Sequence, residues 1–308
     1  MDTSTKSYVK ILLAVTFWAS LYHIAPLPLK YVDIYLVGFI RYVFASLVFL
    51  LVHYYYTKTL LPKLNIKQWL YIIAIGFFGV FLYNIAFLWA EKLISGNIIA
   101  IIYAFSPCFI TVLCSYIFKM KVNLQAKLGI LVALLGTVGV VSFSGYGTDA
   151  ECTVGLSINL GEVLSILAVL CFSAYAILGK SCVRQGINMI TINTYGAIVG
   201  MVMFAIVSLF KSDFGELVDT DLSFWISMMY ISVFATVTSY VWYLQSLEEI
   251  GVYKTAVFQN IMPFLVIIIG FIFYGETLSP LSLLFGAVIF LGVYMTNVAI
   301  NKKGSVTN

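Results

Sequence analysis

The sequence has few charged residues and few of the side chains that hydrolytic or metal chemistry uses. Of its 308 residues, 10% are charged and only 2 are histidines, whereas 62% are hydrophobic. Water-soluble domains carry about 25% charged residues, so this composition excludes a soluble globular protein and predicts an integral membrane protein. The net charge of +4 does not indicate a nucleic-acid partner, because membrane proteins concentrate Lys and Arg in cytoplasmic loops.

Motifs for catalysis, metal binding and ion conduction are also missing. The five cysteines show no CxxC or paired metal spacing, so we expect small packing residues, no metal and no cofactor. The chain has neither an HExxH motif nor a pair of Asp-rich motifs. It therefore shows no signature of a polytopic membrane enzyme. It also lacks the charge rings or carbonyl-filter repeat of a channel. A polytopic enzyme stays the alternative from another functional class.

Long apolar runs fill almost the whole chain. A bilayer core of about 30 Å needs about 20 apolar residues per helix. Ten windows meet this length, at residues 8–25, 33–56, 67–90, 95–118, 124–144, 160–180, 187–210, 222–245, 253–273 and 281–300. The first run follows two lysines as in a signal peptide, but no cleavage site is evident, so we expect a retained helix. The predicted fold is an all-α integral membrane protein with ten transmembrane helices.

The basic residues distribute unevenly between the two predicted sides of the membrane. With the N-terminus placed in the cytoplasm, thirteen of the 17 basic residues fall on the inner side. Lys30, Lys92 and Lys211 fall on the outer side, and Arg41 lies within the second window. Cytoplasmic loops are enriched in Lys and Arg. The pattern therefore predicts cytoplasmic N- and C-termini, and we expect the protein in a bacterial inner (plasma) membrane.

The two halves of the sequence resemble each other at an offset of 156 residues. The aligned identities include Trp69 with Trp225, Pro107 with Pro263, and Gly136 with Gly292. This predicts two copies of a five-helix unit, at residues 1–145 and 156–300, followed by a cytoplasmic tail at 301–308. Because five is odd, the second copy enters the membrane from the opposite side. Inverted repeats of this kind place a substrate site near the membrane midplane.

Short motifs at fixed positions carry a family resemblance. They are Phe17-Trp18-Ala19-Ser20, Arg41-Tyr42, Ser106-Pro107, Gly161-Glu162-Val163-Leu164, Cys171-Phe172-Ser173-Ala174-Tyr175 and Gly275-Glu276. In this order the chain resembles the EamA-type ten-helix branch of the drug/metabolite transporter superfamily over about residues 8–300. The resemblance implies transport of a small metabolite by alternating access. One departure is Lys119-Met120-Lys121, which stands where such proteins often carry Gly-Glu after the fourth helix.

In such transporters helices three, four, eight and nine surround the central path, so the resemblance implies a lining of aromatic and amide groups. The substrate-binding candidates are Trp18, Tyr83, Asn84, Phe87, Tyr103, Tyr175, Ser239, Tyr240, Tyr243 and Gln259. Any one of these rings can instead pack between helices or in an interfacial belt. The lining offers stacking area but little fixed charge. We expect an amino acid as substrate, by export or exchange. The alternative is a cationic or nucleoside-like metabolite such as S-adenosylmethionine, since aromatic faces hold cations.

Several further residues have two interpretations. Arg41 is a structural intramembrane charge or captures a substrate carboxylate, and we favour the structural role. Pro107 and Pro263 remove a backbone hydrogen bond in mid-helix, as hinges or as plain kinks. A third group consists of glycines that permit close helix contact, either within the chain or in a homodimer; they are Gly129, Gly136, Gly139, Gly286 and Gly292.

The position of the carboxylates bears on energy coupling. Every Asp and Glu falls in a loop or within about three residues of a predicted helix end. Proton-driven carriers commonly hold such a group within the bilayer, where its charge state gates the motion. We therefore expect facilitated diffusion or exchange, unless His23, Glu91 or Glu276 couples protons at the outer mouth.

Overall fold

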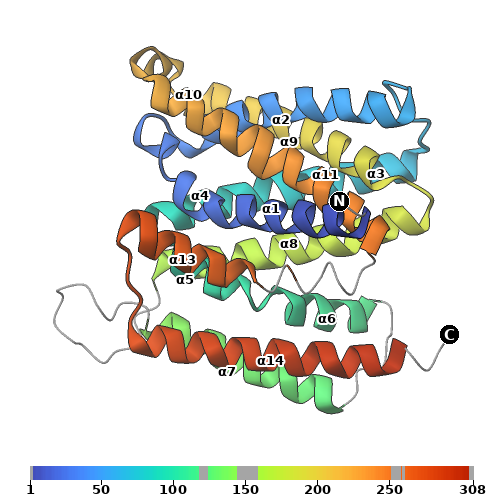
Figure 1. The fold of residues 1–308 in the computed structure, drawn as a ribbon. Coiled ribbons are helices and arrows are strands. Elements are labelled where there is room, and N and C mark those ends of the chain that lie inside the picture. The colour runs from blue at the N-terminus through green and yellow to red at the C-terminus, as the bar shows by residue number, and fades with distance from the viewer. Residues whose placement is uncertain (1–2, 118–123, 144–158, 251–257, 259–260, 305–308) are drawn as a thin grey trace.

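The computed structural model describes residues 3–117, 124–143, 159–250, 258 and 261–304, and all regular secondary structure in these ranges is helical (Figure 1). In the first half the elements are α1 (Thr3–Ile24), η1 (Pro28–Lys30), α2 (Ile34–Thr57), α3 (Ile66–Ile75), η2 (Gly76–Leu82), α4 (Tyr83–Leu93), α5 (Gly96–Tyr103), α6 (Ser106–Ile117) and α7 (Leu124–Phe143). In the second half they are α8 (Leu160–Arg184), α9 (Met189–Lys211), η3 (Phe214–Asp219), α10 (Leu222–Met229), η4 (Tyr230–Thr238), α11 (Ser239–Ile250), α13 (Met262–Tyr274) and α14 (Pro280–Gly304).

Many of these helices have the length and composition of membrane spans. Seven stretches qualify, namely Thr5–Lys30, Ile34–Thr57, Ile66–Leu93, Gly96–Leu113, Leu160–Arg184, Met189–Lys211 and Leu222–Ile250. Shorter apolar helices cover Leu124–Val140, Met262–Tyr274 and Pro280–Thr296. Large apolar side chains also face outward, including Leu51, Phe210 and Phe273, which are 70%, 82% and 75% exposed. Water would make such a surface an aggregation hazard, whereas lipid accommodates it. The protein is an integral membrane protein.

Polar caps set the helix boundaries where apolar runs begin. The Asp33 carboxylate accepts hydrogen bonds from the backbone N–H groups of Tyr35 and Leu36, at 2.7 and 3.1 Å. Asn65 and Asn159 form reciprocal capping boxes at the starts of α3 and α8. These side chains satisfy backbone donors that have no partner within the helix. The described helix starts therefore lie within a few residues of most of the windows expected from hydropathy.

Close packing between helices depends on glycine. In Figure 1, α7 and α14 lie side by side, and a Cβ added at Gly129 would come 2.7 Å from the Gly292 carbonyl oxygen of α14. A Cβ at Gly136 would come 2.7 Å from the Ile289 backbone nitrogen. These glycines thus serve helix packing within the chain. Further pairs are α2 with α9, α1 with α11, and α4 with α8. The pairs interleave helices from the two halves of the sequence.

Two of the long helices contain a π-helical segment. η2 continues α3 into α4, and η4 continues α10 into α11. The two segments end at Leu82 and Thr238, positions that the 156-residue offset places on each other. Within η4 the Thr236 hydroxyl donates to the Ile231 carbonyl at 2.8 Å. Because π-segments turn the following residues relative to an α-helix and are frequent at functional sites, they set the direction of the aromatic side chains that begin α4 and α11.

The two candidate hinge prolines lie near helix starts. α5 ends at Tyr103 and α6 begins at Ser106, so Pro107 falls in the first turn of α6. Pro263 likewise falls in the first turn of α13. The expectation that both prolines kink a continuous helix in its middle is wrong. In a first turn the missing proline N–H has no intrahelical acceptor to lose, so the helix is interrupted before each proline. A hinge at these breaks stays a prediction.

Candidate functional site

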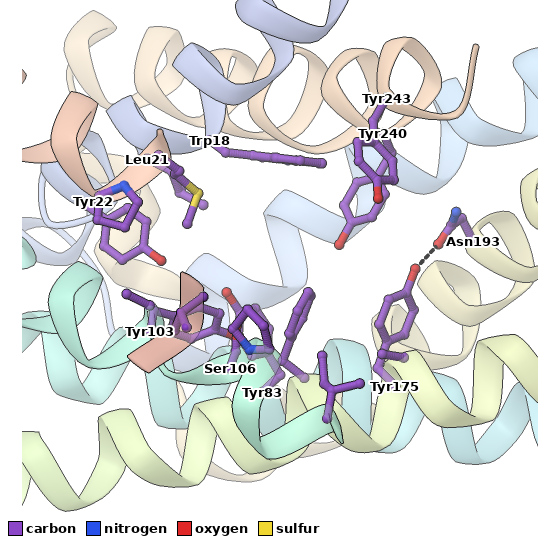
Figure 2. A pocket seen from close by; sticks show the side chains of 18 of the residues that line it. Trp18, Leu21, Tyr22, Tyr83, Tyr103, Ser106, Tyr175, Asn193, Tyr240 and Tyr243 are labelled. Carbon is purple, nitrogen blue, oxygen red and sulfur yellow. Dashed lines mark hydrogen bonds between the residues drawn. The ribbon is translucent and has the colours of Figure 1, made fainter. Parts of the chain in front are cut away.

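A cavity of about 440 Å³ lies inside the bundle, among helices of both halves (Figure 2). Small-molecule sites typically have volumes of about 300–1,000 Å³. Its aromatic lining residues are Trp18, Tyr22, Tyr83, Tyr103, Phe172, Tyr175, Tyr240, Tyr243 and Phe290, and its polar lining residues also include Ser106 and Asn193. The cavity is therefore large enough for a metabolite and is surrounded by rings.

The rings form two facing walls. Trp18 of α1 stands edge-on to Tyr240 of α11, with ring centroids 5.3 Å apart, and lies 5.5 Å from Tyr243. Figure 2 shows Tyr83 and Tyr103 on the other side of the cavity. Their ring centroids are 6.1 Å apart, and Phe172 lies 5.7 Å from Tyr103. Two such walls offer stacking surface to a flat group and negative ring faces to a cation.

The polar groups of the cavity are neutral. The Tyr175 hydroxyl donates to the Asn193 Oδ1 at 2.6 Å (Figure 2). The Asn193 Nδ2 is buried and has no hydrogen-bond acceptor among the described residues. A buried donor without an acceptor is costly, so this amide is positioned to bind a ligand oxygen. None of the described residues on the lining is Asp, Glu, Lys, Arg or His, and the cavity wall that they form carries no fixed charge.

Arg41 lies outside this lining and connects three helical segments. It is 5% exposed, and its Nη1 donates to the Asn84 Oδ1 at 2.9 Å. Its Nε and Nη2 donate to the Thr236 Oγ1 at 3.1 and 3.0 Å. The guanidinium also lies 5.5 Å from the Tyr42 ring centroid. The contacts join α2 to α4 and to η4, which supports the structural role of Arg41 over carboxylate capture.

The structure brings six of the ten predicted binding residues to the cavity. They are Trp18, Tyr83, Tyr103, Tyr175, Tyr240 and Tyr243. Three others, Asn84, Phe87 and Ser239, do not line it. Asn84 accepts a hydrogen bond from Arg41, and Phe87 is covered by Tyr22 with ring centroids 5.4 Å apart. The Ser239 hydroxyl donates to the Phe234 carbonyl. Gln259 lies outside the described residues. Both prolines, Pro107 and Pro263, contribute to the lining.

Sequence reasoning missed Tyr22, Phe172, Asn193 and Ser106 as lining residues. Phe172 and Ser106 lie in the family motifs, yet nothing in the sequence indicated which side of the helix each residue presents. Asn193 gave a clearer signal, since an amide in an apolar helix is costly unless it meets a cavity or a partner.

Different contacts join helices at the two ends of the bundle. At the end that contains Lys10, the Lys10 Nζ lies 3.6 Å from a Glu249 carboxylate oxygen, which joins α1 to α11. At the end that contains His23, the first residue of α5 packs against α1. A Cβ added at Gly96 would lie 2.4 Å from the Tyr22 carbonyl oxygen. The His23 end thus has a backbone contact without room for a side chain.

We expect Gly96→Ala to lower the unfolding temperature of the purified protein in detergent. The added methyl group meets backbone rather than a movable side chain, and overpacking costs about 1–3 kcal/mol. Gly179→Ala is the matched control, because a Cβ there meets nothing within 4 Å and alanine favours a helix interior by about 1 kcal/mol. Equal unfolding temperatures for Gly96→Ala and the unmodified protein would contradict the close contact.

The described helices, their lipid-facing apolar surface and the central cavity define a polytopic membrane protein of the transporter class. Comparison with known families is consistent with this class. The model of the EamA-like transporter family matches residues 5–142 and 159–298. The chain therefore belongs to the EamA-like transporter family, whose members move small molecules across membranes.

Individual relatives are transporters as well. The chain is 28% identical over 221 residues to the uncharacterized transporter YyaM of Bacillus subtilis, a match that covers 72% of this chain and 70% of YyaM. It is 26% identical over 223 residues to an S-adenosylmethionine/S-adenosylhomocysteine transporter of Chlamydia trachomatis, covering 68% and 64%. A solved crystal structure matches with a TM-score of 0.66 at 15% identity, covering 96% and 98%. The last match concerns the fold alone.

Proposed function

We propose that the protein transports a small metabolite by alternating access through the aromatic cavity, with ten transmembrane helices arranged as two inverted five-helix repeats. The two separate family matches, at 5–142 and 159–298, support units at 1–145 and 156–300. A shift of 156 residues maps α1 onto α8 and α4 onto α11, so the contact between α1 and α11 corresponds to the contact between α8 and α4. The same shift maps the end of one π-segment onto the end of the other. The three shorter apolar helices would then complete the ten spans. We do not propose a catalytic role, since the family match and the relatives' names are those of transporters.

The proposed substrate combines a flat ring with a positive charge, as in a cationic nucleoside-like metabolite such as S-adenosylmethionine. The observation that carries this proposal is the lining itself, with six tyrosines, one tryptophan and no ionised group among its described residues. Aromatic faces attract a cation without the desolvation cost of pairing it with a buried carboxylate. The similarity to the Chlamydia trachomatis transporter points in the same direction.

Amino acids, especially aromatic ones, are the second candidate. They carry an ammonium group and a ring, and their carboxylate would need a donor. The unpaired Nδ2 of Asn193 favours this reading, because it can donate to a carboxylate oxygen. S-adenosylmethionine carries the same ammonium and carboxylate, so this donor serves either class. The cationic substrate ranks first because its additional sulfonium charge and its adenine ring suit an aromatic lining without fixed charge.

Counterflow in proteoliposomes tests the proposed function. Vesicles are loaded with unlabelled S-adenosylmethionine, S-adenosylhomocysteine, tryptophan, phenylalanine or adenosine, and the corresponding labelled compound is added outside at equal pH. We expect transient accumulation of labelled S-adenosylmethionine above its equilibrium level. Accumulation of tryptophan alone would move the assignment to amino acids. Absence of counterflow for every compound would contradict the proposed substrate classes.

We further propose a bacterial inner membrane location with both ends of the chain in the cytoplasm. In Figure 1, the beginning of α1 and the end of α14 lie at the same end of the bundle, the Lys10 end. The His23 end would then face the outside. A homodimer stays a prediction, and the sequence gives no reason to expect a nucleic-acid partner.

Reporter fusions test this orientation. We expect cytoplasmic reporters to be active after Lys63, Lys121 and Lys302, and periplasmic reporters to be active at Asp149 and Asp219. The expectation follows from the thirteen basic residues on the inner side against three on the outer side. A reporter active on the opposite side at any of the five positions would contradict the ten-helix topology.

A further inference from the structure

A buried group of ionisable side chains lies at the His23 end, separate from the substrate cavity. His23, Glu91 and Glu276 line a second pocket of about 240 Å³ with Lys30 and Tyr274. His23 and Glu91 are 4% and 7% exposed. The residues come from α1, α4 and the segment after α13, so three parts of the chain meet here.

His23 contacts both α13 and the segment that follows it. The His23 Nε2 lies 2.8 Å from the Val266 carbonyl oxygen, which can only accept, so Nε2 carries a proton. The His23 Nδ1 lies 3.4 Å from the Glu276 Oε1. This contact joins α1 to the segment after α13. The imidazole beside Glu276, together with the Ser95 hydroxyl, lowers the pKa of that carboxyl.

The Glu91 carboxyl group has no comparable partner among the described residues. Both of its carboxyl oxygens are buried, and neither has a hydrogen-bond partner among the described residues. No described lysine, arginine or histidine nitrogen forms an ion pair with it, and Glu276 is already an anion nearby. Burying an isolated carboxylate is strongly unfavourable, and the group neutralises instead. Glu91 is therefore a carboxylic acid while the His23 end is closed.

Other titratable groups around Glu91 do not replace a counter-ion. Tyr22 of α1 and Tyr274 of α13 are neutral phenols that line the same pocket, and Lys30 is exposed at its rim. From α8, Glu162 contributes its carboxylate to the capping box with Asn159. From η4, Tyr230 bonds to the Ser20 hydroxyl of α1. None of these groups supplies a positive charge to Glu91.

Tyr22 separates this pocket from the substrate cavity. Among the described residues it is the one that lines both chambers, and Figure 2 shows its ring at the edge of the substrate cavity. The closure beside it is tight, since a Cβ added at Gly270 would lie 2.8 Å from the His23 ring. Glu91 therefore lines the same pocket as His23 and Glu276, and Tyr22 separates that pocket from the substrate cavity.

We propose that Glu91 is the proton-carrying group of a proton–substrate antiporter, with the His23–Glu276 pair as the latch that covers it from outside. This proposal rests on the proposed transport function. When the His23 end opens, water reaches Glu91 and the carboxylate takes up a proton from outside, which removes the charge that prevents closure. In the closed state Glu91 stays protonated until a cationic substrate enters the cavity; the charge of the substrate then favours the carboxylate, and the proton leaves past Tyr22 to water in the cavity. The carboxylate that remains is buried and unpaired, which drives reopening and carries the substrate outward.

Proteoliposome transport separates this proposal from the proposed function. Counterflow of labelled S-adenosylmethionine at equal pH tests transport alone. For the gradient test, the vesicles contain right-side-out protein and are loaded with labelled S-adenosylmethionine. With an imposed pH gradient, acidic outside, we expect efflux of the label to accelerate at least several-fold. In Glu91→Gln the acceleration should be absent and exchange should no longer vary with pH. Glu216→Gln, at an exposed position in η3, is the matched control and should retain the gradient response. Counterflow without any gradient response in the unmodified protein would overturn the antiport while leaving the transport function standing.

Infrared spectroscopy supplies a test that needs no substrate. A protonated buried carboxyl gives a C=O stretching band distinct from that of carboxylates. We expect this band at neutral pH in the purified protein and in Glu216→Gln, and we expect its loss in Glu91→Gln. Absence of the band from the unmodified protein would overturn the proposal even if no labelled compound were transported.

Discussion

Arg41→Met is expected to lower the unfolding temperature of the purified protein strongly while leaving membrane insertion intact or improved. The guanidinium supplies three hydrogen bonds that join α2 to Asn84 on α4 and to Thr236 in η4. Hydrogen bonds that involve a charged group contribute about 1.5–3 kcal/mol each, so the loss is roughly 3 kcal/mol or more. An apolar side chain enters the bilayer more easily than arginine. Insertion and packing should thus change in opposite directions.

The lysine variant separates charge from geometry at this position. Arg41→Lys keeps the positive charge, but a single ammonium group cannot reproduce the planar fork that reaches both Asn84 and Thr236. We expect its unfolding temperature to lie between those of Arg41→Met and the unmodified protein. The two variants are compared by thermal unfolding in detergent and by the amount inserted in membranes. Normal stability with weakened substrate binding would instead identify Arg41 as a ligand for a substrate carboxylate.

The positions of most helices and the all-helical membrane class were predictable because hydropathy acts on whole helices. The windows 33–56 and 222–245, for example, correspond to α2 and to the run from α10 through α11. The break between α5 and α6 was not predictable in the same way, since apolar composition continues through Ala104 and Phe105. Interruption of a helix depends on its neighbours, and the proline alone gave only an approximate position.

The residues that line the cavity were harder to predict than the helices. A side chain must face the cavity, and no neighbouring side chain may cover it. Tyr83 and Phe87 stack with ring centroids 6.0 Å apart, so they share a face of α4. Tyr22 of α1 nevertheless covers Phe87, and only Tyr83 reaches the cavity. Glu91 shows the same difficulty. The sequence placed it at a charged helix break, but α4 continues to Leu93 and turns Glu91 inward.

Removal of the aromatic wall is expected to have the largest effect on transport. We expect Trp18→Ala and Tyr240→Ala each to raise the half-saturation concentration for S-adenosylmethionine in proteoliposome exchange. Stacking of a base on an aromatic side chain contributes about 1–3 kcal/mol, which corresponds to roughly 5- to 150-fold. Tyr240→Phe keeps the ring and should change the value much less. The comparison therefore distinguishes a stacking surface from a hydroxyl that binds the substrate.

The control for this series must lose a similar ring elsewhere on the molecule. Tyr55→Ala is suitable, because Tyr55 is 69% exposed on α2 and does not line the cavity. It should retain normal exchange. Trp18 and Tyr240 are each only half-buried although they lie inside the bundle and line the cavity. Truncation of either therefore removes its cavity face together with the ring contact between α1 and α11. Normal exchange by Trp18→Ala and Tyr240→Ala together would remove the aromatic wall from the substrate path, whereas loss of folded protein in both would show that the rings serve packing.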